Sequence, residues 1–264
     1  MTFGVHSEVG RLRQAILHRP GLELSRLTPQ NMDSLLFDDV LWASRAVSEH
    51  DEFAEALRAR GVRVHYFGQL LAETLDIPAG REFVLDRVCT PEYLGPCLAG
   101  PVRALADGLD SQRLAEYLVG GVLKADLKPL RPASLKSPAS LKSLKWDMLH
   151  ADDFVLPPLP NHLFARDNSC WIYGSVSVNP MAMPARRRET LHIRAIYRYH
   201  PLFAGPGAEA GAGPEAGAEA GPGLLTYFDD DRGHLPASIE GGDVHILGSG
   251  AVLIGMGERT TPMA

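Results

Sequence analysis

Two low-complexity segments limit how this 264-residue chain can fold more than any other feature of its sequence. Residues 124–145 contain an imperfect Ala-Ser-Leu-Lys-Ser repeat and three prolines, and residues 204–223 consist of Gly, Ala, Pro and Glu. Such residues bury too little apolar surface to offset the entropy that is lost when a chain becomes ordered. We therefore expect a mobile linker at 124–145, a disordered loop at 204–223, and an ordered fold built from the residues around them.

The composition excludes several classes of protein. No stretch reaches the roughly 18 apolar residues of a membrane span, and the first 17 residues lack the apolar run of a signal peptide. The cysteines, Cys89, Cys97 and Cys170, form no CxxC pair, so neither a disulfide framework nor a zinc site is indicated. A net charge of −6 with one short basic cluster at 186–188 argues against nucleic acid as a binding partner. We expect a cytoplasmic protein that binds a small molecule and has no membrane partner.

The first part of the chain predicts a strand, a helix and a second strand. Residues 13–18 have the pattern of a short strand, residues 40–60 carry an apolar stripe at helical spacing, and residues 62–67 have a strand pattern again. Gly61 stands where a left-handed helix cap belongs. The spacing therefore predicts a strand, helix, strand unit.

Helical pieces are predicted next, over residues 74–121. Pro78, Pro91 and Pro101 interrupt them, and the last piece begins with Ser111 as N-cap and ends at a Gly-Gly pair. We expect this segment to form a helical subdomain inserted into the rest of the fold.

Strand patterns dominate the last part of the chain. Residues 171–178 alternate bulky and small side chains as a half-buried strand does, and residues 243–247 and 251–254 are typical of a hairpin joined by Gly-Ser-Gly. An α/β fold in three parts follows. The parts are residues 1–73, the helical insert with its linker at 74–150, and residues 151–264.

Common catalytic motifs are absent from the sequence. It has no GxxxxGK[ST] loop, no GxGxxG after a strand, no HExxH and no GxSxG. Instead, the prolines of residues 157–160 lead to Asn161 and Asp167, which stand at the entrance of a predicted strand and are therefore held with little freedom. The alternative is a structural loop in which Asp167 caps local amides.

A second acidic motif is the Glu-Gly-Gly-Asp sequence from Glu240 to Asp243. Its glycines let the backbone approach a ligand, and apolar neighbours are predicted to desolvate Glu240 and raise its pKa toward a range useful for proton transfer. Arg186 and Arg259 add cations near strand ends, and a planar guanidinium is suited to gripping a carboxylate. A plain turn and solvated surface arginines are the alternatives.

Several blocks of the sequence, taken in order, are similar to bacterial arginine deiminases. They are GVHSEVGRLR (residues 4–13), LLFDDVLW (35–42), LAEYLVGGV (114–122), LPPLPN (156–161), ARDNSCWIYG (165–174), NPMAMPARRRET (179–190), IEGGDV (239–244) and GMGERT (255–260). Each block is a weak signal alone, but their order and spacing make the resemblance specific. The chain thus resembles the arginine deiminase family.

This resemblance implies an incomplete pentein fold, an α/β propeller of repeated units interrupted by a helical bundle. It also implies hydrolysis of L-arginine to L-citrulline and ammonia. In that reaction a cysteine thiolate attacks the guanidinium carbon, ammonia leaves, and water hydrolyses the thiouronium intermediate. The family resemblance implies neither a metal nor an organic cofactor.

By position, the resemblance makes Asp167 and Glu240 the acids that hold the guanidinium, with Glu240 also moving protons. The other matched positions are Arg186 and Arg259, which would clamp the α-carboxylate, Asn161 in the substrate pocket, Phe164 as an apolar wall, and Asp243 as a supporting carboxylate.

The sequence departs from the family in what it lacks: the family's His-x-Asp motif and nucleophilic cysteine have no match among these residues. Cys170 matches a non-catalytic position, and His162, His192 and His245 match no catalytic histidine, so packing or exposed roles are expected. We expect a chain that is inactive alone and either poorly stable or self-associating as a homo-oligomer, because uncovered strand edges promote association. A non-catalytic arginine-binding module and a related pentein, such as an amidinotransferase or a dimethylarginine hydrolase, are the alternatives.

Overall fold

The computed structural model describes residues 3–127, 144–203, 225–227 and 236–264, and these form a mixed α/β fold. The strands are β1 (Gln14–Leu17), β2 (Arg63–Tyr66), β3 (Val122–Leu123), β4 (Phe154–Leu156), β5 (Ser169–Ile172), β6 (Ser175–Val178), β7 (Leu225–Tyr227), β8 (Val244–Gly248) and β9 (Ala251–Ile254). The α-helices are α1 (Leu22–Ser25), α2 (Ala43–Arg58), α3 (Phe67–Leu75), α4 (Pro78–Val88), α5 (Pro91–Leu94), α6 (Ala99–Asp107), α7 (Ser111–Gly120), α8 (Lys124–Leu127), α9 (Leu144–Met148) and α10 (Arg187–Tyr199). Short 3-10 turns are η1 (Asp33–Leu35), η3 (Pro160–Leu163), η4 (Pro184–Arg186) and η5 (Gly241–Asp243).

The described strands make four small sheets. β1 pairs with β2 in parallel, β3 with β4, β5 and β7 both with β6, and β8 with β9. None of these sheets closes on itself within the described residues. The α/β class predicted from the sequence is therefore present, as a set of separate two- and three-stranded sheets.

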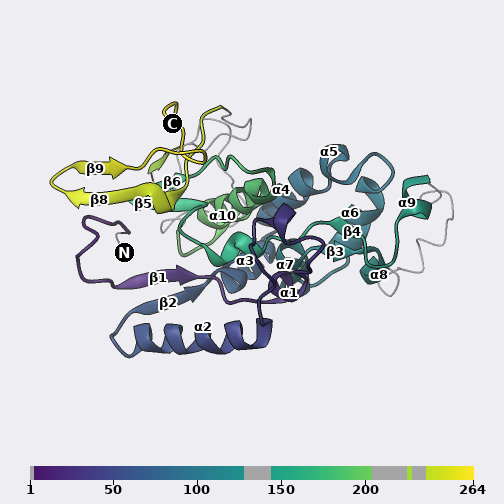
Figure 1. Cartoon of the computed structure of the whole chain (residues 1–264), viewed down its shortest axis with the longest axis horizontal. Coiled ribbons are helices and arrows are strands. Elements are labelled where there is room, and N and C mark those ends of the chain that lie inside the picture. Colours follow the sequence, from purple (N-terminus) through teal and green to yellow (C-terminus); the bar gives the residue numbers. More distant parts are fainter. Residues whose placement is uncertain (1–2, 128–143, 204–224, 228–235) are drawn as a thin grey trace.

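The strand, helix, strand unit at the N-terminus is present as predicted. α1, η1 and α2 connect β1 to β2, α2 lies along the strand pair (Figure 1), and Gly61 ends the connection at φ +77°. The helix begins at Ala43, three residues later than predicted, and its apolar stripe is not a buried face. Ala54 is fully buried, whereas the Phe53 side chain is 52% exposed. Two four-residue strands are too small to cover a 16-residue helix.

The breaks between helical pieces that the prolines predicted are confirmed, and two of these prolines start the helix that follows the break. Pro78 and Pro91 are the first residues of α4 and α5, where a missing N–H costs nothing and the fixed φ is already helical. The N-cap of α7 is Asp110 and not Ser111, because the Asp110 carboxylate accepts a hydrogen bond from the N–H of Arg113 at 2.9 Å.

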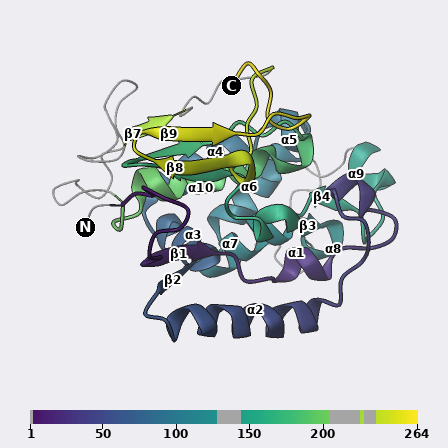
Figure 2. The same cartoon turned by 60° about the vertical axis from the view of Figure 1, so that its left-hand side comes forward.

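The largest apolar core joins the helical segment to the later strands. α10 packs against α3, α4 and β6, and its buried Ile196 shares a core with Leu71 of α3, Val84 of α4 and Val176 of β6. Figures 1 and 2 both place α10 between the β8–β9 hairpin and the β1–β2 pair. A central helix of this kind can carry side chains toward a site formed by the C-terminal turns. The boundaries at residues 73 and 150 stay a prediction.

The strand predicted over residues 171–178 is wrong in detail. The chain turns at Tyr173 and Gly174, where Tyr173 has φ +53°, so the segment forms the antiparallel β5–β6 hairpin. The β8–β9 hairpin is confirmed, with Ser249 and Gly250 at positive φ in its turn.

Of the two low-complexity segments, residues 128–143 and 204–223 lie outside the described residues. The ends of the predicted linker are helical, as α8 and α9. Lys124 holds the two together, because its Nζ donates to the carbonyls of Trp146 and Leu149, both at 2.7 Å. Among the described helices, none has both the length and the apolar composition that a bilayer span needs.

Candidate functional site

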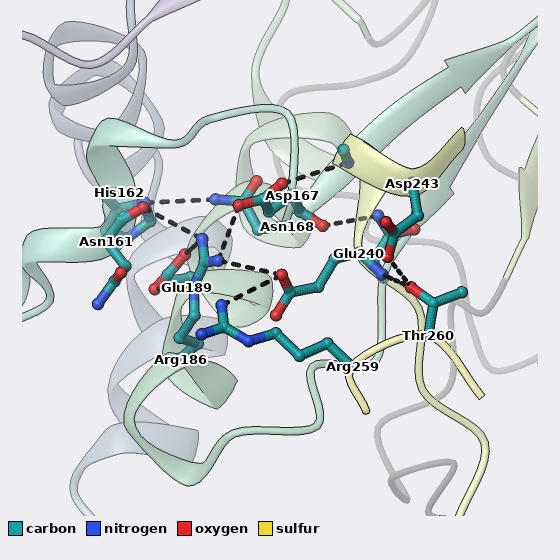
Figure 3. A network of polar contacts seen from close by, with 12 residues as sticks. Asn161, His162, Asp167, Asn168, Arg186, Glu189, Glu240, Asp243, Arg259 and Thr260 are labelled. Carbon is teal, nitrogen blue, oxygen red and sulfur yellow. Dashed lines mark hydrogen bonds and ion pairs between the residues drawn. The ribbon is translucent and has the colours of Figure 1, made fainter. Parts of the chain in front are cut away.

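Asp167 lies where the sequence placed it, just before β5. Its backbone carbonyl accepts hydrogen bonds from the N–H of Gly241 at 3.0 Å and from Asn179 Nδ2 at 2.7 Å. Its carboxylate accepts from the N–H of Gly242 at 3.2 Å and from Arg186 Nη1 at 2.8 Å. The acidic side chain is thereby fixed between the start of β5 and the Glu-Gly-Gly-Asp turn (Figure 3).

Arg186 occupies the centre of the site, at the end of η4. Its side chain is 1% exposed, and the guanidinium donates four hydrogen bonds. Two of these go to Glu189, at 3.0 and 2.9 Å, one to Asp167, and one to the carbonyl of Asn161 at 3.2 Å. Its Nη1 also lies 3.6 Å from Glu240 Oε2. Because these N–H groups already have acceptors in the protein, Arg186 is a fixed cation.

Glu240 reaches the same centre from the opposite side, immediately before η5. The residue is 6% exposed, and its Oε2 lies 3.6 Å from Arg186 Nη1 and 3.5 Å from Arg259 Nη1. Its Oε1 is buried and has no hydrogen-bond partner among the described residues. Burial raises the pKa of Glu240, and the two arginines only partly offset this, so the shift is in the direction predicted from the sequence.

Thr260, which no sequence pattern predicted as a site residue, contacts Glu240. Its hydroxyl accepts a hydrogen bond from the N–H of Glu240 at 3.0 Å and donates to Asp243 Oδ2 at 2.5 Å. Asp243, predicted as a supporting carboxylate, is thus linked to Glu240 through Thr260. A buried threonine beside an arginine-bearing turn gives no distinct sequence signal.

Glu189 is the second residue that the sequence analysis missed. Its side chain is fully buried and bonds Arg186 twice, and burial raises its pKa. Asn168 also bonds it, and the amide of Asn168 lies 3.5 Å from Nδ1 of His162. A signal was present, because Glu189 follows Arg186 at the spacing of ion pairs in helices.

Two other predicted site residues lie at the edge of the cluster. Asn161 is buried, and its Nδ2 donates to the carbonyl of Leu35 at 2.7 Å, so the side chain anchors the η1 turn. Phe164 is 49% exposed, and its ring centroid lies 6.4 Å from that of Phe37. Among the described residues, neither side chain forms a hydrogen bond with Asp167, Glu189 or Glu240.

Three of the four histidine and cysteine residues weighed from the sequence, His162, His192 and Cys170, are buried packing groups. His162 and His192 are buried and stacked at 5.4 Å, and burial lowers the pKa of both, that of His192 to about 3. His245 is exposed. Cys170 is buried, and burial raises the pKa of its thiol to about 11, which agrees with the structural role predicted for it.

The ion-pair cluster consists of three carboxylates and two arginines: Asp167, Glu189, Glu240, Arg186 and Arg259. When all five side chains are ionised, the cluster has a net charge of −1. Among the described residues, no three His, Cys, Asp or Glu side chains converge as a metal site. A buried acidic cluster with an unpartnered oxygen is suited to a cation that donates hydrogen bonds. Fold and site together define a mixed α/β protein whose site is built around a buried ion-pair cluster.

Comparison with known protein families agrees with this description. A family model described as arginine deiminase matches residues 33–264. This match covers most of the chain, and the protein therefore belongs to the arginine deiminase family. Membership supports an arginine-deiminase-like function, that of a hydrolase acting on arginine, at the level of the family.

Proposed function

We propose that the cluster binds the guanidinium group of L-arginine as part of an arginine deiminase. The observation that carries this proposal is Glu240 Oε1, a buried carboxylate oxygen with no hydrogen-bond donor among the described residues. Leaving a buried polar group unpaired costs about 1 to 3 kcal/mol. A guanidinium bound between Glu240 and Asp167 removes that cost, because it donates charge-assisted hydrogen bonds to both carboxylates.

The other predicted roles follow from this placement. Arg259, at the open side of the cluster, grips the α-carboxylate of the ligand, and Phe164 forms an apolar wall beside the plane of the guanidinium. Arg186 is proposed for the same carboxylate on the family's pattern, but its N–H groups contact Glu189, Asp167 and Asn161 in the unliganded protein. These contacts use four of its five N–H groups, so a direct contact with ligand comes either from the remaining N–H of Nη1, which lies 3.6 Å from Glu240 Oε2, or from the exchange of one of these acceptors. Asn161 acts by holding the pocket wall, and Asp243 by holding Thr260.

In the proposed reaction a cysteine thiolate attacks the guanidinium carbon, ammonia leaves, and water releases citrulline. None of the three cysteines fits that role. Burial raises the pKa of both Cys89 and Cys170 to about 11, and Cys97 lies in the turn between α5 and α6. We infer that this chain by itself binds arginine without turning it over at an appreciable rate, because loss of a nucleophile costs on the order of 10⁴ to 10⁶ in rate. The cysteines favour a binding role over catalysis by the chain alone.

Several finer features belong to the same proposal. The separate sheets are proposed to be units of a pentein propeller, and the helical segment an insert within it. A cytoplasmic location and a homo-oligomer are proposed on the same basis.

Calorimetry tests the proposed function with L-arginine and with L-citrulline, in which a neutral urea replaces the guanidinium. We expect arginine to bind more tightly than citrulline. Asp167→Asn should weaken arginine binding by about tenfold or more, because a charge-assisted contact contributes roughly 1.5 to 3 kcal/mol. Asp152→Asn, which changes an exposed carboxylate, should leave binding unchanged and serves as the matched control.

Two outcomes count against the proposal. If the wild-type chain binds arginine no better than citrulline, the cluster does not recognise a guanidinium. If the purified chain forms citrulline well above background, the inference about its cysteines is wrong.

A further inference from the structure

Two arginines of the site differ in how they are held. The Arg186 side chain is 1% exposed and donates four hydrogen bonds to Glu189, Asp167 and Asn161. The Arg259 side chain is 43% exposed, and its Nη1 lies 3.5 Å from Glu240 Oε2, at the long limit of a hydrogen bond. The Arg186 guanidinium is a fixed part of the fold, while that of Arg259 is loosely held by Glu240.

The backbone that carries Arg259 is fixed, in contrast to its side chain. The next residue, Thr260, is 1% exposed and is tied to Glu240 and Asp243 through its hydroxyl. Thr261 continues this attachment, because its N–H donates to the carbonyl of Ser238 at 2.9 Å. Movement at this position is therefore restricted to the side chain, which extends toward Glu240 (Figure 3).

The contact has a consequence for binding. Arg259 brings a guanidinium to Glu240, and a guanidinium is also the group that Glu240 would bind in a ligand. Both are planar cations that donate through N–H groups, and a ligand held by both oxygens of Glu240 takes Oε2, which Arg259 contacts, as well as the unpartnered Oε1. The contact of Arg259 is part-buried and, at 3.5 Å, lies at the long limit of a hydrogen bond, so it can be exchanged at little cost.

We propose that Arg259 is an exchangeable internal counter-ion of Glu240. It neutralises Glu240 in the unliganded protein, yields that carboxylate to the ligand's guanidinium, and then pairs with the ligand's carboxylate. This inference rests on the proposed function and adds to it that a single arginine both opposes and assists binding. For a ligand that has a guanidinium but no carboxylate, displacing Arg259 from Glu240 still costs free energy, and the displaced Arg259 then has no ligand carboxylate to bind.

The test compares L-arginine with n-propylguanidine, which lacks the carboxylate, by calorimetry on the whole chain. Arg259→Gln should weaken arginine binding by about tenfold or more, because a charge-assisted contact is lost. The same variant should tighten propylguanidine binding by roughly twofold to fivefold, because a weak competing ion pair is removed. Opposite signs for the two ligands are the expected result.

Two further variants serve as controls. Arg187→Gln removes one positive charge from an exposed neighbour of Arg186 and should change neither affinity. Arg259→Lys keeps a cation beside Glu240 and should bind propylguanidine as the wild type does. Thermal unfolding followed by circular dichroism checks that each variant folds, which is expected because both substituted side chains are at least partly exposed.

The measurements distinguish failure of the Arg259 exchange from failure of the proposed function. If Arg259→Gln weakens arginine binding but fails to tighten propylguanidine binding relative to the wild type, the exchange is disproved and the proposed function stands. If the wild type binds arginine no better than citrulline, the proposed function itself fails.

Discussion

Arg186 and Glu189 are joined by two hydrogen bonds, from Nε to Oε1 at 3.0 Å and from Nη2 to Oε2 at 2.9 Å. Both side chains are almost completely buried. The pair connects η4 to the first turn of α10, and through Arg186 it also fixes Asp167. Its consequence is that the acidic site depends on a cation that the fold itself supplies.

Glu189→Gln should strongly destabilise the protein. Burial raises the pKa of Glu189, but two hydrogen bonds from Arg186 favour its charged form, unlike the longer contacts of Glu240. Removing one partner of such a buried ion pair typically costs about 3 to 5 kcal/mol, because the other charge stays buried without full compensation. Urea unfolding measures this as a fall in the free energy of unfolding. Glu258→Gln, which changes an exposed glutamate, should stay within about 0.5 kcal/mol of the wild type. Similar values for the two variants would show that Glu189 does not compensate the Arg186 charge.

Glu240→Gln should stabilise the fold at neutral pH while it removes arginine binding. Burial raises the pKa of Glu240, so the folded chain takes up this proton more readily than the unfolded chain. Its favourable contribution is therefore complete below the unfolded pKa and is lost as pH rises through the folded pKa. The variant should gain on the order of 1 kcal/mol at pH 7. The gain should shrink toward zero in acid, as measured by urea unfolding over a pH series, and a pH-independent difference would contradict this account.

Gly241→Ala should prevent Glu240 from being placed correctly. An added Cβ at position 241 would lie 1.9 Å from the carbonyl oxygen of Arg166 and 2.8 Å from Cys170 Cβ. The turn must move to relieve this overlap, so we expect a loss of at least about 3 kcal/mol in the free energy of unfolding. In α3, Gly68→Ala meets nothing within 4 Å and should be neutral or stabilising by up to about 1 kcal/mol. Equal effects in thermal unfolding would mean that position 241 has more room than the structure shows.

Thiol labelling should separate the three cysteines. Cys97 is exposed, whereas burial raises the pKa of both Cys89 and Cys170 to about 11. Iodoacetamide reacts with thiolates, so at pH 8 it should modify Cys97 at least about ten times faster than either of the others. Mass spectrometry of the labelled peptides gives these rates, and labelling in urea provides the control in which all three react. Rapid modification of folded Cys170 would reopen a chemical role for it.

The sequence by itself determined the local structure and the chemistry available at each position. Periodicity predicted the β1, α2, β2 unit and the β8–β9 hairpin, because these patterns reflect which faces of nearby residues are apolar. It also indicated that Glu240 would be desolvated, since the residues next to it in the chain are apolar or glycine. The sequence pattern misplaced the N-cap of α7 by one residue, because the side chain of a single residue decides where a helix is capped. It also predicted one strand where β5 and β6 form a hairpin, because the turn between them depends on the positive φ of Tyr173.

Only the tertiary structure decided which residues form hydrogen bonds and ion pairs with one another at the site. Asn161 bonds a carbonyl 126 residues away, and Gly242 bonds a carboxylate 75 residues away. No local pattern records such contacts, because they depend on how α10 and the C-terminal turns pack around one core. For the same reason the sequence predicted one role, binding of the ligand's carboxylate, for both Arg186 and Arg259. Packing buries Arg186 among carboxylates and leaves Arg259 partly exposed to solvent.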